Sequence, residues 1–386
     1  MKILITHNDY GRPSGEEVAV DTMGTMMKAY GHQITYYRPS TAGHQKGMLN
    51  KIRIFISGIY SRKGVRGIKK ILQDENPDII NVHNLYPFIS PPALFACRSA
   101  RVPVVMTVHN YRLICPTGLF LRNDRPCEHC LHQRSEWGCV RYNCEKNIFK
   151  SLGYALRGYI ARKTGAYEKN VDHYVCLTSF QKGKLIEAGF KAEKITVIPN
   201  SIRLSPTAPD DAGEYIAYVG RLSPEKGWDM LMEVAERNPG LRIEVAGLGA
   251  DRTVYPTNVR LRGYLSRTEL AEFYRRARFL VIPSRCYEGF PLVALEAMAM
   301  GRPVVAPDHG GFTEIIGKGP DAIGCLFQPN DSKDLETTMI RLWANQEMAQ
   351  SFGKKCIEKI RSSYSSEMIY RQWEHLFTEL LQPGKN

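Results

Sequence analysis

The sequence contains no apolar run of the roughly 18 residues that a membrane-spanning helix requires. Its first residues, MKILITHNDYG, hold one lysine and a very short apolar stretch, so we expect no secretory signal and a cytoplasmic protein. Repeats of fixed period are also missing. Contents of 43% hydrophobic and 24% charged residues are ordinary for globular proteins, and the 386 residues are long enough for two domains.

Acidic residues are outnumbered, with 39 Asp and Glu against 52 Lys and Arg, which favours an anionic partner. Segment 44–73 carries eight Lys and Arg residues and no acid, interleaved with apolar side chains, and segment 146–163 is similar. Both predict basic amphipathic helices on an anionic membrane surface, although helices with an ordinary solvated basic face are the alternative. Because no recognised nucleic-acid module is present, we expect no nucleic-acid partner.

Short β-branched strands alternate with helical segments, and this pattern starts twice. The first series includes KILIT, QITYYR, PDIINVHN, PVVMTVHN, VDHYVCLT and ITVIPN; the second includes EYIAYVG, LRIEVAG, VRLRGY, RFLVIPS and RPVVAP. Such alternation predicts parallel βαβ units. The aperiodic segment 200–214 reads as a linker, so we place the domains at 1–203 and 204–365.

Ligands of open α/β sheets bind beyond the carboxyl ends of the strands. Two predicted strands of the first domain end in His-Asn, at His83-Asn84 and His109-Asn110, where the side chains either bind a ligand or cap the strand. The loop before Gly15 is rich in glycine and precedes a helix, which suits a phosphate. It matches neither GxGxxG nor the Walker A pattern, and an ordinary turn is the alternative.

In the second domain, Arg221 and Lys226 flank a turn between a strand and a helix, which suits a diphosphate or a solvated basic turn. Gly247 ends the next strand, where a flat ligand or only a tight turn fits. Glu288 and Glu296 are separated by seven residues in an otherwise apolar segment. A carboxylate in such surroundings needs a partner, either a sugar or ribose hydroxyl or a nearby arginine.

The motifs GRLSPEKG, YEGFPLVALEAMAMGRPVVA and HGGFTEII resemble retaining nucleotide-sugar glycosyltransferases of family 4, in which the two glutamates form an E-x7-E motif. VHNLYPFISP and TVHNYRLICPTG are similar to bacterial members that build surface polysaccharides. The resemblance implies an α/β GT-B fold, in which two doubly wound Rossmann-like domains face an interdomain cleft and helix 366–386 packs back on the first domain.

The resemblance also implies residue roles. Glu288 would contact the donor sugar, Glu296 the ribose and Tyr264 the base, while Arg221 and Lys226 would neutralise the leaving diphosphate. The catalytic set is His109, Glu288, Arg221 and Lys226; the donor-binding set is Gly15, Arg221, Lys226, Gly247, Tyr264, Glu288, Gly289, Phe290, Pro291, Leu292 and Glu296; the acceptor-side set is Glu16, Asn84, His109 and Asn110.

These expectations describe a retaining hexosyltransferase of bacterial surface-polysaccharide synthesis, peripheral on the inner face of the plasma membrane. It would use a UDP- or GDP-sugar and a glycan or polyprenyl-diphosphate-linked acceptor. No DxD-like carboxylate pair ends a predicted strand, so no catalytic metal is expected. The alternatives are a GT-B-fold epimerase or phosphorylase, and a non-catalytic protein that binds nucleotide sugars or acts as a membrane adaptor.

A cysteine-rich loop follows His109. Cys127 and Cys130 have the spacing of metal ligands, and Cys139 and Cys144 complete a possible structural zinc site with four thiolates. Free thiols and disulfides are the alternatives, and a cytosolic setting disfavours disulfides.

Overall fold

The computed structural model describes residues 1–11, 14–43, 47–202, 213–249 and 254–382. Its contacts divide the chain into two compact units. Unit 1 comprises residues 1–119, 128–201 and 369–386, and unit 2 comprises residues 120–127 and 202–368. Most of the linker predicted at 200–214 lies outside the described residues, as do residues 44–46 of the basic segment.

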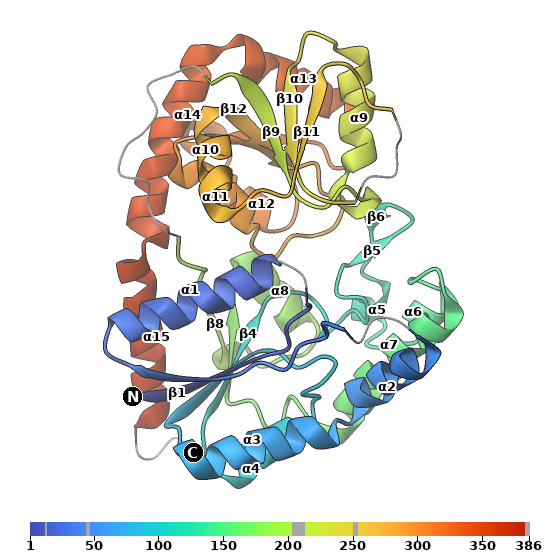
Figure 1. Ribbon diagram of the computed structural model, residues 1–386, viewed down its shortest axis with the longest axis vertical. Helices are drawn as coiled ribbons and strands as arrows, with labels where there is room; N and C mark the ends of the chain where they lie inside the picture. The colour runs from blue at the N-terminus through green and yellow to red at the C-terminus, as the bar shows by residue number, and fades with distance from the viewer. Residues whose placement is uncertain (12–13, 44–46, 203–212, 250–253, 383–386) are drawn as a thin grey trace. The chain divides into compact units, whose positions relative to one another are not determined.

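Unit 1 is built on a six-stranded parallel sheet of order β2-β1-β3-β4-β7-β8 (Figure 1). Its strands are β1 (Lys2–His7), β2 (Gln33–Tyr37), β3 (Ile79–Asn84), β4 (Val104–Val108), β7 (His173–Cys176) and β8 (Ile195–Val197). Its helices are α1 (Gly15–Ala29), α2 (Met48–Ile59), α3 (Arg62–Glu75), α4 (Ala93–Ser99), α5 (His129–His132), α6 (Gly138–Arg141), α7 (Ile148–Thr164), α8 (Ser179–Glu187) and the short η1 (Ala192–Lys194).

Both faces of this sheet are buried, which explains why its strands read as continuous apolar runs. Successive side chains of a strand point to opposite faces, so Leu4 packs with α3 and α4 while Ile3 and Ile5 pack with α1. The C-terminal helix α15 (Ser366–Leu381) joins α1 on that second face through Trp373 and its neighbours, as Figure 1 shows.

Unit 2 has a second six-stranded parallel sheet, of order β11-β10-β9-β12-β13-β14. Its strands are β9 (Tyr215–Val219), β10 (Ile243–Ala246), β11 (Val259–Gly263), β12 (Ala277–Val281), β13 (Val304–Pro307) and β14 (Cys325–Phe327). The hairpin of β5 (Leu121–Arg122) and β6 (Arg125–Pro126) is counted with this unit. Its helical segments are η2 (Pro224–Lys226), α9 (Trp228–Arg237), α10 (Arg267–Arg276), α11 (Leu292–Ala299), α12 (Gly311–Ile316), η3 (Gly319–Asp321), α13 (Ser332–Ala344), α14 (Gln346–Lys359) and η4 (Ile360–Tyr364).

The predicted architecture of two doubly wound α/β domains is confirmed, because each unit holds one parallel sheet in βαβ connection. Every strand predicted from the sequence is present, and the structure adds β14, of three residues, and the two-residue strands β5 and β6. Among the described residues, no helix combines the length and the apolar character that crossing a bilayer requires.

Candidate active site

The predicted donor residues of unit 2 lie at one edge of its sheet. Arg221 follows β9, Gly247 follows β10, Tyr264 follows β11 and Glu288 follows β12. Because these strands are parallel, their carboxyl ends share that edge, which is where open α/β sheets bind their ligands.

An ion pair lies at the centre of this edge. Lys226, the last residue of η2, places its Nζ 2.5 Å from Oε1 of Glu288. The hydroxyl of Ser284 donates a hydrogen bond to the same oxygen at 2.6 Å. Burial disfavours both charges, yet Lys226 lowers the pKa of Glu288 and Glu288 raises the pKa of Lys226. Both groups are therefore charged at neutral pH.

Arg221 adds a second cation beside this pair. Its Nη2 lies 3.0 Å from Oε1 of Glu225, and its side chain is half exposed. Lys226 and Arg221 thus differ in availability: Lys226 is bound to a site carboxylate, whereas Arg221 has a guanidinium that solvent reaches.

Glu296 lies about two turns into α11, as the sequence predicted, and its partner is a tyrosine. Tyr274 of α10 donates its hydroxyl proton to Oε2 of Glu296 at 2.9 Å. Burial raises the pKa of Glu296, while Tyr274 and the charge of Arg267 act against that rise. Within the described part of the chain, no protein group donates to Oε1 of Glu296, so this oxygen can accept a ligand hydroxyl.

The loop that carries Glu288 is fastened to the residues after β13. The amide of Gly311 donates to the carbonyl of Glu288 at 2.9 Å, and Nε2 of His309 donates to the carbonyl of Ser284 at 3.2 Å. Sequence reasoning assigned no role to Ser284, Tyr274 or His309. His309 stands in the HGGFTEII motif and Ser284 ends a predicted strand, whereas no local signal pairs Tyr274 with Glu296.

The packing of the strands requires glycine at position 247, whether or not a ligand binds there. A Cβ atom there would lie 1.8 Å from the carbonyl oxygen of Gly220, so the ends of β9 and β10 approach too closely for another residue. Pro291 precedes the first turn of α11, and the buried Phe290 and Pro291 fix how the chain enters this helix. Tyr264 is 60% exposed, so its side chain is open to solvent.

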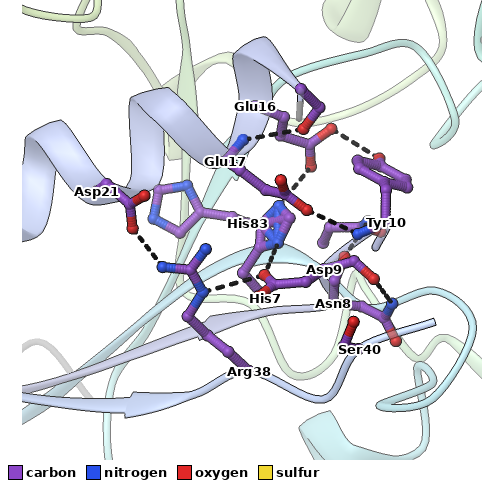
Figure 2. Close-up of polar contacts among 12 residues, drawn as sticks. His7, Asn8, Asp9, Tyr10, Glu16, Glu17, Asp21, Arg38, Ser40 and His83 are labelled. Atoms are coloured by element: carbon purple, nitrogen blue, oxygen red, sulfur yellow. Dashed lines mark hydrogen bonds and ion pairs between the residues drawn. The ribbon is translucent and has the colours of Figure 1, made fainter. Parts of the chain in front are cut away.

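A second group of polar residues lies at the carboxyl ends of β1, β3 and β4 in unit 1. Three strands, not two, end in His-Asn here, because β1 is followed by Asn8 after His7. The repeated dipeptide was visible in the sequence at this position too, but the prediction used only His83 and His109. Figure 2 shows His7 and His83 close to Glu16, the second residue of α1.

Glu16 is enclosed by this group. Tyr10 donates its hydroxyl proton to Oε2 of Glu16 at 2.8 Å, and His7 Nε2 lies 3.6 Å from Oε1 (Figure 2). Burial raises the pKa of Glu16, against which Arg112 and the hydrogen bond from Tyr10 act. Ser14 is the N-cap of α1, its hydroxyl accepting from the amide of Glu17, so it orients the first turn that presents Gly15 and Glu16.

His83 and His109 form a direct pair. Nδ1 of His83 lies 2.7 Å from Nε2 of His109, so the two rings share one proton in a hydrogen bond. Burial lowers the pKa of His109 to about 4, and burial with the neighbouring His109 lowers the pKa of His83 well below its usual value. Burial lowers the pKa of His7 to about 3, helped by His109 and Arg38. All three imidazoles are therefore neutral at neutral pH, and those of His83 and His109 are hydrogen-bonded to each other.

The two predicted asparagines fix turns. Asn84 is buried, donates to the carbonyl of Asn8 at 3.2 Å and accepts from the amide of Tyr86 at 3.0 Å. Asn110 accepts from the amide of Arg112 at 3.1 Å, and its side chain also bonds Glu16. Asn84 therefore caps the end of its strand, whereas Asn110 connects the turn after β4 to Glu16.

None of the ten cysteines, all of which the structure describes, is joined in a disulfide. Cys139 is hydrogen-bonded to Cys144. This bond is the main reason that the pKa of Cys139 is raised, and burial raises it further. Among the described residues, the group whose possible ligand atoms lie within 4.8 Å of one another is Glu128, His132 and Glu187. Lys184 donates to both of these carboxylates, so an ammonium group already balances them. The zinc site at Cys127, Cys130, Cys139 and Cys144 stays a prediction.

Two parallel-sheet Rossmann-like units define an α/β protein of the GT-B fold. Comparison with solved structures agrees: sucrose-phosphate synthase from Thermosynechococcus elongatus has a TM-score of 0.72 over 98% of both chains, at 19% identity. HepE of Anabaena, solved in complex with UDP and glucose, has a TM-score of 0.66 over 98% of this chain and 100% of its own, at 16% identity.

The sequence model described as Glycosyltransferase Family 4 matches residues 13–205, and that described as Glycosyl transferases group 1 matches residues 205–359. The chain therefore belongs to glycosyltransferase family 4. An exopolysaccharide phosphotransferase of Streptomyces coelicolor is 34% identical over 230 residues, or 55% of this chain. The chain spans 24% of the length of that relative.

Proposed function

We propose that the protein is a retaining hexosyltransferase that moves a sugar from a UDP- or GDP-sugar to a glycan or polyprenyl-diphosphate-linked acceptor in bacterial surface-polysaccharide assembly. The observation that carries this proposal is the Lys226–Glu288 pair, with Glu296 two turns further on, at the ligand-binding edge of the unit 2 sheet. The UDP and glucose of HepE and the exopolysaccharide relative support the choice of ligands.

In this proposal unit 2 binds the donor. Departure of a nucleoside diphosphate builds negative charge on phosphate oxygens, and the fixed cations Lys226 and Arg221 stabilise that charge. In unit 2, the amide N–H groups of Gly289, Phe290 and Leu292 also face the phosphate and sugar, whereas Pro291 has no N–H group. Glu288 accepts hydrogen bonds from sugar hydroxyls through Oε2, because Oε1 is taken by Lys226 and Ser284. Glu296 accepts from the ribose through Oε1.

Unit 1 supplies the acceptor side, where His109, Glu16 and Asn110 are the groups that receive the acceptor. The leaving phosphate takes the proton of the acceptor hydroxyl on the same face of the sugar, so the anomeric configuration is retained. Glu288 is not the nucleophile in this scheme. The two cations perform the charge stabilisation, so no step requires a catalytic metal.

The test starts with the melting temperature of the protein against a panel of nucleotides and nucleotide sugars. A ligand at a hundredfold its dissociation constant adds about 2.7 kcal/mol of stability. The donor that shifts the curve is then supplied with acceptors, and the anomeric configuration of the product is read by NMR. Glu288→Gln should lower kcat more than donor affinity, and Glu296→Ala should weaken donor binding.

Glu336→Gln is the matched control, because Glu336, like Glu288, pairs with a cation of unit 2, in this case Arg237, outside the proposed site. Wild-type turnover in both Glu288→Gln and Glu296→Ala would refute the assignment. An inverted product would refute retention. Interconversion of free nucleotide sugars, or phosphorolysis, would place the chain with the epimerases or phosphorylases.

We further propose that α2 and α7 rest on an anionic membrane. The two helices contact each other, with the ring of Phe55 against Gly153. Six large apolar side chains of these helices are exposed: Ile52, Phe55, Ile56, Ile148, Phe149 and Leu152. Exposed cations lie among and beside them at Arg53, Arg62, Lys63, Arg66 and Lys146. Apolar anchors with basic neighbours suit the boundary between acyl chains and anionic headgroups.

Vesicle sedimentation tests this surface. Phe149→Ser should weaken binding to phosphatidylglycerol vesicles, whereas Val254→Ser should not, although both side chains are 79% exposed. Added salt should weaken wild-type binding, because the attraction of exposed charges is screened. Equal binding to neutral and anionic vesicles would refute the electrostatic part.

A further inference from the structure

Two arginines of unit 1 have no role in the scheme above. Arg112 follows β4 and Arg157 belongs to α7, and in the described residues neither guanidinium has a carboxylate oxygen within 4.0 Å. Arg162, five residues after Arg157 on α7, shows the usual arrangement, because it donates two hydrogen bonds of 2.8 Å to Glu136. Arg112 and Arg157 therefore differ from Arg162 in having no such carboxylate partner among the described residues.

One turn of the chain holds both side chains. Nη2 of Arg157 donates to the carbonyl of Pro116 at 3.2 Å. Two residues later, a Cβ atom on Gly118 would lie 2.7 Å from Cγ of Arg112, so this glycine packs directly against the Arg112 stem. The turn between Cys115 and Gly118 thus fixes the two guanidinium groups in one neighbourhood.

The other walls of this neighbourhood are tyrosines. The guanidinium carbon of Arg157 lies 4.1 Å from the ring centre of Tyr154 and 4.3 Å from that of Tyr86. Nη1 of Arg112 donates to the hydroxyl of Tyr10 at 3.4 Å, and its buried Nε has no partner among the described residues. Aromatic faces orient a guanidinium and leave its N–H groups pointing outward.

The charges do not balance here. Glu16 is the nearby acid; it is already bonded to Tyr10, and its charge acts on Arg112. Burial, and then the positive charge of Arg112, lowers the pKa of Arg157. A buried charge without a counter-ion is costly, so the arrangement favours a bound anion. The planar fork of N–H donors on arginine matches phosphate oxygens.

We propose that Arg112 and Arg157 form a subsite for the phosphate or diphosphate group of the acceptor. This inference rests on the proposed function, because it names the chemical class of acceptor that unit 1 receives. The position of Arg157 connects the subsite to the α2–α7 surface: Gly58 of α2 lies against its side chain, and the exposed Phe149 and Leu152 precede it on α7. A phosphate attached to a lipid would suit both features.

Calorimetry with inorganic diphosphate and with geranyl diphosphate tests the subsite. Both probes are measured in a Lys226→Gln background, so that binding at the donor edge does not dominate. Arg112→Gln and Arg157→Gln should each weaken diphosphate binding by about tenfold or more, as expected for lost hydrogen bonds to a charged group. Tighter binding of geranyl than of inorganic diphosphate would assign the ligand to a lipid; equal binding would assign it to the phosphate group alone.

Arg141→Gln is the control, because Arg141 also lies over a tyrosine, Tyr142, but is exposed at the surface. Arg157→Lys keeps the charge and removes the fork, so it should retain folding and lose part of the affinity. Unchanged diphosphate binding in folded Arg112→Gln and Arg157→Gln would overturn the inference. This readout needs no turnover, so it remains decisive if the donor assignment fails.

Discussion

Replacing Lys226 by methionine tests how Glu288 is held in its site. The methionine keeps most of the apolar stem and removes the charge 2.5 Å from Glu288 Oε1. Breaking a fully buried ion pair costs about 3–5 kcal/mol. The side chains of Lys226 and Glu288 keep 26% and 18% of their exposure, so solvent screens the remaining carboxylate. We therefore expect a loss of about 1–3 kcal/mol in the free energy of unfolding.

The double variant Lys226→Met with Glu288→Gln decides whether this loss is a pair interaction. When both charges are absent, no charged group stays buried without a partner, and stability should return to within about 1 kcal/mol of wild type. Urea unfolding followed by tryptophan fluorescence measures all members of the cycle. The exposed pair Arg237–Glu336 is the control, for which a coupling of about 0.2–1 kcal/mol is expected. Additive losses at Lys226 and Glu288 would refute the reasoning.

The pH dependence of this cycle follows from the pKa shifts. The pKa of Glu288 is lowered in the folded protein, so its contribution is full above about pH 4.3, the unfolded value, and falls as the pH drops through the folded value. The pKa of Lys226 is raised, so its contribution is full below about pH 10.4 and falls as the pH rises through the folded value. The difference between wild type and Lys226→Met should therefore be constant between about pH 5 and pH 10.

Three further changes test other parts of the site. Tyr274→Phe leaves Glu296 without its hydroxyl donor and should lower unfolding free energy by about 1 kcal/mol in urea titrations; an unchanged midpoint would contradict this pairing. His83→Phe removes the hydrogen bond to Nε2 of His109 and should reduce kcat by on the order of tenfold. His83→Asn can still donate a hydrogen bond, so it should recover most of the lost rate. Equal rates in both variants would argue against positioning of His109 by His83. If the cysteine loop holds structural zinc, emission spectrometry should find about one equivalent per chain, lost in Cys130→Ser; a metal-free, active protein would end that prediction.

The sequence predicted the sheet strands well, because a parallel sheet covered on both faces requires short β-branched runs. Those runs exist at β1, β3, β4, β9, β12 and β13, and parallel order then places their carboxyl ends together. The residues after these ends, including His109 and Glu288, were found for that reason. β14 was missed because three residues, CLF, are too few to show alternation or a run.

Side-chain partnerships were less accessible from the sequence. Tyr274 and Glu296 are 22 positions apart on different helices, and only the packing of α10 against α11 brings them together. Ser284 could not be linked to Glu288 before the loop after β12 was known to fold back toward the α12 loop. His7 is a different case, because its His-Asn dipeptide at a strand end can be read directly from the sequence.

The two units use positive charge differently. In unit 2, Lys226 is held by Glu288, a carboxylate that stays ionised at neutral pH. A diphosphate would therefore interact with a lysine that is already positioned and already paired. In unit 1, the three histidines are neutral, and the positive charge resides in two arginines without carboxylate partners among the described residues. Neutral imidazoles suit sugar hydroxyls, whereas unpaired guanidinium groups suit phosphate oxygens. An acceptor with both kinds of group, a glycan joined to a phosphate, would use every one of these side chains.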